Sequence, residues 1–236
     1  MKQILPALLT ISTYIPFTQI FGIGGFGFQG GQSLLSIESS QSTEGGATLN
    51  TSEFLNPFSG GGYLYIDALP VIDLEADFSI SVKNYIFDFS NSSVEEGESV
   101  LRSIGPYDFG WADFSVYLTA RKKIVGIGIP LLAKAKLFYG GGYNMHTVTP
   151  LMSLDLMESA MGGDLTVDPS NLSEDDLIEI LKDNQMKSNG FHIQSGLQFK
   201  VLFLDTFVFY RHTFAKDIIT SQNHFGSLNV RIGYGL

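Results

Sequence analysis

The sequence predicts an all-β fold, an eight-stranded antiparallel up-and-down transmembrane β-barrel with two short helices in one extracellular loop. Two observations predict it. Residues 227–236 (SLNVRIGYGL) alternate strictly between apolar and small or polar side chains, as in a strand with one apolar and one polar face. Seven earlier segments also have the composition of strands, and the connections between them alternate between long polar stretches and short turns. Long connections at one end and short turns at the other are typical of a barrel that crosses a membrane with strands.

The composition limits the classes of protein that the chain can form. Only 16% of its 236 residues are charged, 13% are aromatic and 26 are Gly, which favours strands, tight turns and interfacial rings. The absence of Cys excludes disulfides, thiolate catalysis and Cys-based zinc sites. The net charge is −10, and the acidic residues of the chain are concentrated in the predicted connections. The sequence contains no cluster of basic residues that would form a basic stripe. We therefore expect no nucleic-acid binding and no cofactor.

The start of the chain predicts a targeting segment. Met1 and Lys2 precede a mostly apolar, uncharged run from Ile4 to Ile15, which has the length of a signal-peptide core and is too short to cross a bilayer as a helix. We expect residues 1–18 to be a signal peptide and residues 19–236 to form the barrel domain. A buried N-terminal strand is the alternative.

The first three strands are predicted at residues 19–30, 61–68 and 73–89. A long exposed loop separates the first two and ends at residue 59, because Ser, Gln, Thr, Glu and Gly dominate that stretch. Leu69–Val71 turns the chain back into the third strand, whose apolar and polar residues alternate clearly. A soluble sandwich would also produce this alternation, so the third strand alone does not distinguish the two architectures.

The fourth and fifth strands are predicted at residues 109–121 and 131–146. The acidic stretch 90–108 precedes the fourth strand and predicts a long connection. Residues 122–130 (KKIVGIGIP) predict a turn between the two strands.

The longest predicted connection, residues 147–189, contains two segments with apolar residues at helical spacing. Thr149 is an N-cap candidate for the first helix, with Pro150 at the first helical position. Ser173 opens the second helix, which has acidic residues in its first turn. We expect both helices to pack over the barrel mouth, and contact of their Met-rich face with a partner or lipid is the alternative.

The sixth and seventh strands, residues 191–201 and 205–214, lead to the closing strand. The seven connections then run long, short, long, short, long, short and intermediate, which places both chain ends on one side. With this pattern the chain resembles the small eight-stranded outer-membrane barrels, the OmpA-like and OmpW-like proteins. Residues 227–236 resemble the C-terminal signal of that class, which usually ends in Phe or Trp, whereas this chain ends in Leu236. The resemblance implies a bacterial outer-membrane location, contact with outer-membrane lipid, and recognition of Ser227 to Leu236 by the barrel-assembly machinery.

The alternation also places charged residues of both signs inside the predicted barrel. An eight-stranded barrel is just wide enough to be filled by its own side chains. Because an unpaired charge in that narrow space costs several kcal/mol, we expect ion pairs, a filled lumen and no open diffusion pore. The predicted lumen residues are Asp67, Glu75, Asp77, Lys83, Asp113, Arg121, Lys134, Lys136, Lys200, Asp205, Arg211 and Arg231.

The histidines and their serine neighbours do not predict an active site. His192 and Ser195 are three residues apart, as are His224 and Ser227, and residues at this spacing in a strand point to opposite faces. Neither pair is therefore preassembled for the His–Ser chemistry of barrel enzymes that modify lipid A. A metal site at His212 and His224, across the last hairpin, is an alternative to the more common role of rim histidines as interfacial polar groups.

We therefore expect a non-enzymatic outer-membrane barrel with a structural or surface-interaction role. Its acidic outer loops are candidate sites for divalent cations or a surface partner. The alternative is a narrow transporter or binder of small apolar molecules, as in the OmpW-like proteins, with Met152, Leu156 and Met157 lining an open mouth. A soluble lipocalin-like binder is a third possibility.

Overall fold

The computed structural model describes residues 24–67, 72–95, 98–129, 132–219 and 222–235. The predicted signal peptide and Leu236 lie outside the described residues, as does the predicted turn at Leu69–Val71.

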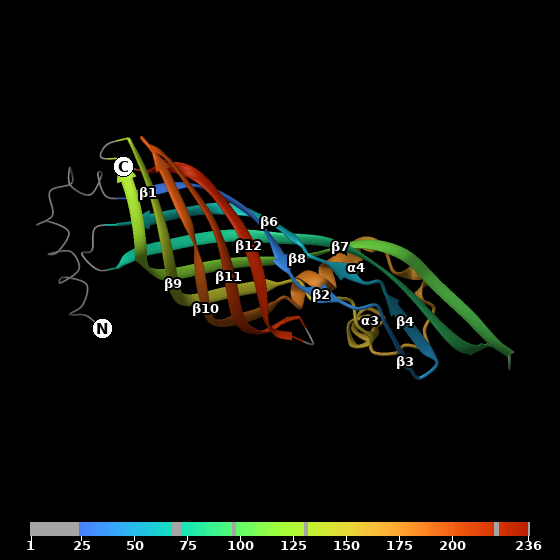
Figure 1. The fold of residues 1–236 in the computed structure, drawn as a ribbon. Coiled ribbons are helices and arrows are strands. Elements are labelled where there is room, and N and C mark those ends of the chain that lie inside the picture. Colours follow the sequence, from blue (N-terminus) through green and yellow to red (C-terminus); the bar gives the residue numbers. More distant parts are fainter. Residues whose placement is uncertain (1–23, 68–71, 96–97, 130–131, 220–221, 236) are drawn as a thin grey trace, which may run out of the picture.

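Antiparallel strands close into a ring of eight (Figure 1). The first and last strands of the ring pair with each other, with Gly25 opposite Gly235, and the pairing of β7 with β8 completes the circle. In chain order the ring consists of β1 (Gly24–Leu34), β6 (Phe58–Ile66), β7 (Asp73–Glu95), β8 (Glu98–Ile129), β9 (Ala133–Val148), β10 (Met186–Val201), β11 (Leu204–Ile219) and β12 (Gln222–Gly235).

The outward side chains of the ring are apolar and the inward ones are mostly polar. Phe78 on β7, Phe191 on β10 and Val230 on β12 remain about half exposed, whereas the inward residues Glu75 and Arg231 are buried. A closed ring pairs every strand edge, and an apolar outer face is stable against lipid. The predicted eight-stranded up-and-down transmembrane barrel is therefore confirmed.

The two ends of the barrel differ in size. Both described chain ends and the β10–β11 turn at residues 202–203 lie at one end, and the long connections form a separate lobe at the other (Figure 1). We call the lobe the part beyond the ring that consists of residues 35–57, 83–95, 98–111 and 149–185. No helix in the described part of the chain is long and apolar enough to span a membrane.

The strand β8 overturns two predicted connections. It runs without interruption from Glu98 to Ile129, so that the predicted residues 109–121 are only its middle. Residues 98–104 pair with β7 beyond the ring, and residues 122–129 pair with β9. The connection predicted at 90–108 and the turn predicted at 122–130 are therefore wrong. Strand pairing uses backbone groups, so a hairpin with a polar face need not show the apolar alternation of a lipid-facing strand.

The stretch between β1 and β6 is also more ordered than predicted. It contains β2 (Ser36–Ile37), which pairs with β5 (Phe54–Leu55), and the hairpin of β3 (Ser40–Glu44) with β4 (Ala47–Thr51). The strand β4 extends the sheet beside the far part of β7. The prediction of a long exposed loop is wrong because its few apolar residues, such as Leu49 and Phe54, are buried in the lobe.

The two predicted helices are present in one connection. They are α3 (Leu154–Ala160) and α4 (Glu174–Asp183), separated by the short 3-10 helix η1 (Pro169–Asn171). Ser173 caps α4, as predicted, and it also forms a capping box with Asp176. The N-cap of α3 is Ser153 and not Thr149, because the backbone N–H of Thr149 still donates to Ala112 O at the end of the sheet.

Candidate functional site: the charged lumen and its cover

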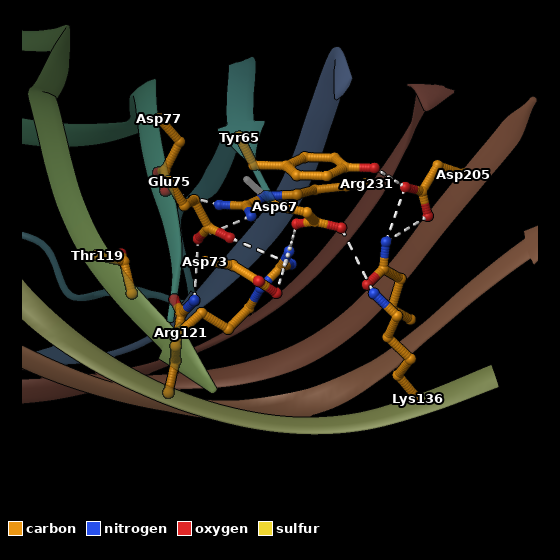
Figure 2. A network of polar contacts seen from close by, with 12 residues as sticks. Tyr65, Asp67, Asp73, Glu75, Asp77, Thr119, Arg121, Lys136, Asp205 and Arg231 are labelled. Atoms are coloured by element: carbon orange, nitrogen blue, oxygen red, sulfur yellow. Dashed lines mark hydrogen bonds and ion pairs between the residues drawn. The ribbon is translucent and has the colours of Figure 1, made fainter. Parts of the chain in front are cut away.

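Two buried carboxylates of β7 form the centre of the lumen. Arg231 on β12 approaches Glu75 Oε1 with Nη1 at 2.9 Å and Asp77 Oδ2 with Nη2 at 2.6 Å. Arg211 on β11 binds Asp77 with two parallel hydrogen bonds, of 3.0 Å from Nη1 and 2.7 Å from Nη2. All four side chains are at most 3% exposed. Strands from opposite sides of the ring therefore meet in one ion-pair network, part of which is shown in Figure 2.

Two amide side chains add hydrogen bonds to this centre. Gln29 on β1 donates to Asp77 Oδ1 at 3.1 Å and accepts from Arg231 Nε at 2.9 Å. Gln194 on β10 donates to Glu75 Oε1 at 2.9 Å and accepts from Arg211 Nε at 3.0 Å. Neither glutamine is among the predicted lumen residues, because only charged side chains were considered. Their inward position in the strand alternation is the signal that would have found them.

Aromatic rings fill the space around the guanidinium groups. Arg211 Cζ lies 3.9 Å from the centre of the Tyr117 ring, and Arg231 Cζ lies 4.5 Å from that of Phe209 and 4.9 Å from that of Tyr63. These distances are within the range of cation–π contacts. The charged centre is thus enclosed by rings as well as by opposite charges.

Arg121 extends the network toward the end of the barrel where the chain ends lie. It is 3.4 Å from Glu75, 3.3 Å from Asp67 and 3.5 Å from Asp73 (Figure 2). Lys136 also contacts Asp67, at 3.4 Å. The structure therefore connects seven of the predicted lumen residues: Asp67, Glu75, Asp77, Arg121, Lys136, Arg211 and Arg231.

Asp205 belongs to a neighbouring cluster. It accepts hydrogen bonds from the Tyr65 hydroxyl and from Gln198 Nε2, the latter at 2.8 and 3.0 Å (Figure 2). Lys200 lies directly opposite Asp205 in the β10–β11 ladder and opposite the exposed Lys134 in the β9–β10 ladder. These side chains border the end of the barrel and not its charged centre.

A second polar group lies nearer the lobe. His146 Nδ1 is 3.0 Å from both carboxylate oxygens of Asp113, and His192 Nε2 is 2.9 Å from the Thr119 hydroxyl. The Tyr117 ring makes edge contacts with both imidazoles. Lys83, the remaining predicted lumen residue, is half-buried opposite Trp111 at the boundary with the lobe.

The His–Ser pairs singled out in the sequence are separated as expected from their spacing. His192 is buried, whereas Ser195 lies on the outer face and donates to Phe138 O at 3.0 Å. His224 is exposed and Ser227 is buried. Neither pair brings a base to a hydroxyl group.

An apolar core fills the lobe above the lumen. Met152 and Met157 are at most 3% exposed, and Leu156 packs against the same core. The Tyr85 hydroxyl accepts a 3.0 Å hydrogen bond from the backbone N–H of Met152, and burial raises the pKa of Tyr85 to about 12. The helical connection is therefore fixed to β7 by packing and by a hydrogen bond.

Polar contacts hold the far part of the same connection. Asn91 on β7 donates 2.6 Å hydrogen bonds to Leu165 O and Val167 O, and Arg102 on β8 pairs with Asp168 at 3.3 Å. A surface pocket of about 670 Å³ remains between this connection and the β3–β4 hairpin, with Leu49, Leu151 and Met152 among its lining residues. Within the described ranges there is no group of three or more His, Asp or Glu side chains placed to hold a metal ion.

No family model and no curated protein matches the chain. Solved structures that are similar over most of both chains include three outer-membrane proteins. Ail of Yersinia pestis, in complex with the heparin analogue sucrose octasulfate, is 13% identical, with 90% of this chain and 98% of Ail covered and a TM-score of 0.40. Neisserial surface protein A is 11% identical (91% and 97% covered, TM-score 0.44), and OprG from Pseudomonas aeruginosa is 10% identical (90% and 92% covered, TM-score 0.42).

These identities and TM-scores are too low to carry an argument about this chain. The ring of eight antiparallel strands follows from the strand pairing of this chain itself. The chain has the architecture of the small eight-stranded outer-membrane barrels, the OmpA-like and OmpW-like class that its sequence resembles.

Proposed function

We propose that the protein is a bacterial outer-membrane barrel with a structural or surface-interaction role, a lumen closed by ion pairs, and a lobe that faces the outside of the cell. The outward apolar side chains of the ring would contact outer-membrane lipid, and the barrel-assembly machinery would recognise Ser227 to Leu236. The placement of both described chain ends opposite the lobe supports this orientation, because such barrels keep their short turns on the periplasmic side.

The observation that carries the closed lumen is the burial of its charges. Glu75, Asp77 and Arg231 are fully buried, and their partners come from strands on opposite sides of the ring. A water-filled channel at this depth would leave such groups solvated. The apolar core of the lobe, with Met157 and Leu177 completely buried, provides a second layer over the same axis.

Conductance across a planar bilayer tests the closed lumen. The intact protein should show no steady large conductance, because the ion pairs and rings occupy the lumen. A double variant, Asp77→Ser with Arg231→Ser, keeps the net charge but removes both side chains from the centre. It should conduct if the ion-pair network is the barrier, and it should stay closed if the lobe above the lumen is sufficient. Steady large conductance from the unaltered chain would contradict the proposal.

Cysteine labelling tests the orientation, because the natural sequence has no Cys. Ser42 is exposed on β3 of the lobe, and Lys134 is exposed at the opposite end of the barrel. A membrane-impermeant maleimide should label Ser42→Cys on intact cells, and Lys134→Cys only after the cells are opened. The reverse pattern would place the lobe in the periplasm. Fractionation with outer membranes and heat-modifiable gel mobility would test the location itself.

A binder or narrow transporter of small apolar molecules is the second candidate, and the surface pocket favours it. Apolar residues of the lobe, Leu49, Leu151 and Met152, contribute to its wall. Flux of small apolar molecules into liposomes, lost when Leu151→Trp fills the pocket, would support this candidate over the structural role. A lipid A-modifying activity receives no support from the positions of His192 and Ser195.

A further inference from the structure

The outward face of the last hairpin carries two neighbouring histidines near the lobe. His212 on β11 lies directly opposite Gly226 on β12, and Phe214 lies opposite His224. Gly226 has no side chain, and a Cβ there would lie only 2.5 Å from the Tyr210 hydroxyl oxygen. The missing side chain therefore lets the Tyr210 ring lie over the strand at Gly226, beside His212 and His224.

The two imidazoles are placed like ligands of one ion. Their ring centres are 5.2 Å apart and the rings are inclined by 32°. Metal–nitrogen bonds of about 2.0–2.1 Å at a tetrahedral angle put the centres of two liganding imidazoles roughly 5 Å apart. The spacing of His212 and His224 agrees with that value without any movement of the backbone.

A hydrogen bond selects the nitrogen that His212 can offer. Its Nδ1 is 2.9 Å from the Tyr210 hydroxyl oxygen, which leaves Nε2 for an ion. Such a contact from outside the coordination shell fixes the ring orientation of a metal-binding histidine. Phe214, with its ring centre 4.7 Å from that of His212, restricts the same ring from another side.

The pocket around the two histidines has room for an ion, and its donor atoms determine which ions it suits. The two histidines and Tyr210 line a surface pocket of about 610 Å³, together with Gln222 and Asn223. No carboxylate lines this pocket, so it lacks the oxygen-rich donor set that calcium and magnesium require. Imidazole donors suit copper and zinc instead.

We propose that His212 and His224 form a binding site for a divalent transition-metal ion, Cu²⁺ or Zn²⁺, with water in the remaining coordination positions. The ion bridges β11 and β12 at the base of the lobe. Cu²⁺ should bind more tightly than Zn²⁺, following the general order of divalent ions.

Titration of the purified full-length chain in detergent with Cu²⁺ tests the site. We expect one ion per chain and an electron paramagnetic resonance spectrum with hyperfine splitting from two nitrogens. His212→Phe and His224→Phe each remove a ligand and keep an aromatic ring at the interface, and each should abolish the two-nitrogen signal. Tyr210→Phe should weaken binding by about 10-fold, because it removes only the group that orients His212.

Two controls make the result specific. Tyr139→Phe removes a hydroxyl group from another outward-facing tyrosine, on β9, and should leave Cu²⁺ affinity unchanged. Heat-modifiable mobility should remain in every variant, because the replaced side chains lie outside the barrel interior. Absence of Cu²⁺ binding by the unaltered chain, or an unchanged two-nitrogen spectrum after either histidine is replaced, would overturn the proposal.

Discussion

The strands β7 and β8 run through both the barrel and the lobe, and the two regions place opposite chemistry on the same face. In the barrel, the inward positions of β7 carry Glu75 and Asp77. Farther along the same face, in the lobe, they carry Tyr85, Phe87 and Phe89, which are at most 2% exposed. The side-chain parity is unchanged, and only the polarity of the face inverts.

The partner strand shows the same inversion. On β8 the buried inward residues are Arg121 and Asp113 in the barrel, followed by Trp111 and Phe109 in the lobe. In the proposed arrangement lipid surrounds the barrel, so apolar residues face outward and polar residues fill the interior. Water surrounds the lobe, so its apolar residues must face inward. The inversion near Lys83 therefore predicts the position of the membrane boundary on both strands.

The charged interior of the barrel gives the largest expected effect. Arg231→Met keeps the bulk of the side chain but leaves Glu75 and Asp77 without one of their cations. Removing one partner of a buried ion pair costs about 3–5 kcal/mol of stability, because the other charge is left unpaired. We expect a loss of this size in the free energy of unfolding, measured by urea titration of the reconstituted barrel. The matched control is Lys134→Met at an exposed position, and an equal loss there would contradict a special role for the buried network.

The apolar interior of the lobe should give a loss that stays local. Phe87 is completely buried, and Phe→Ala at such a position costs about 3–5 kcal/mol. Phe87→Ala should shift the fluorescence of Trp111, the single tryptophan, and expose residues 149–185 to protease. The barrel should keep its heat-modifiable mobility. Ile86→Ala, on the opposite face of the same strand, is the control, and simultaneous loss of the barrel would refute the independence of the two regions.

Charges on the outer face of β7 should locate the boundary between the regions. Ile80 and Ile86 lie on the same face and are 49% and 47% exposed. Arg on the lipid face costs about 2–4 kcal/mol near the middle of the bilayer and about 0–1 kcal/mol near its surface. Ile80→Arg should therefore reduce folding into lipid vesicles much more than Ile86→Arg does. Equal effects would place the boundary elsewhere on this strand.

The difference between the regions also explains how much of the fold was predictable. Alternation against lipid is a strong signal, and together with strand composition it predicted the eight strands of the ring and the inward positions of Glu75, Asp77 and Arg231. Residues 40–51 and 98–104 of the lobe lack that signal, because they are mostly polar and their apolar residues are few. The hairpin of β3 with β4 and the far part of β8 were therefore mistaken for loops.

The candidate site was predictable only in part for a related reason. Sequence parity decides which side chains point inward but not how strands pair across the lumen. It therefore could not show that Arg211 and Arg231 share Asp77, or that Asp113 binds His146 instead of an arginine. Gln29 and Gln194 were missed because the role of an uncharged amide in an inward position cannot be inferred until its charged neighbours are known.

The cap of α4 provides the smallest test of the lobe's independence. The Ser173 hydroxyl accepts from the Asp176 backbone N–H, and the Asp176 carboxylate accepts from the Ser173 backbone N–H and hydroxyl. Ser173→Ala should cost about 1 kcal/mol of lobe stability, with no effect on the barrel. The hydrogen bonds from Ser173 lower the pKa of the Asp176 carboxyl.

The sign of the pH effect follows from that shift. A carboxyl whose pKa is lower in the folded state stabilises the fold above its unfolded pKa, and this stabilisation disappears as the pH falls through the lowered value. Acid should therefore weaken α4 in the unaltered chain more than in Asp176→Asn, where no carboxyl remains to titrate. Limited proteolysis of residues 149–185 as a function of pH measures the difference. Because α4 lies in the lobe, Asp176→Asn should leave the heat-modifiable mobility of the barrel unchanged, and a parallel loss of that mobility would show that the lobe and the barrel unfold together.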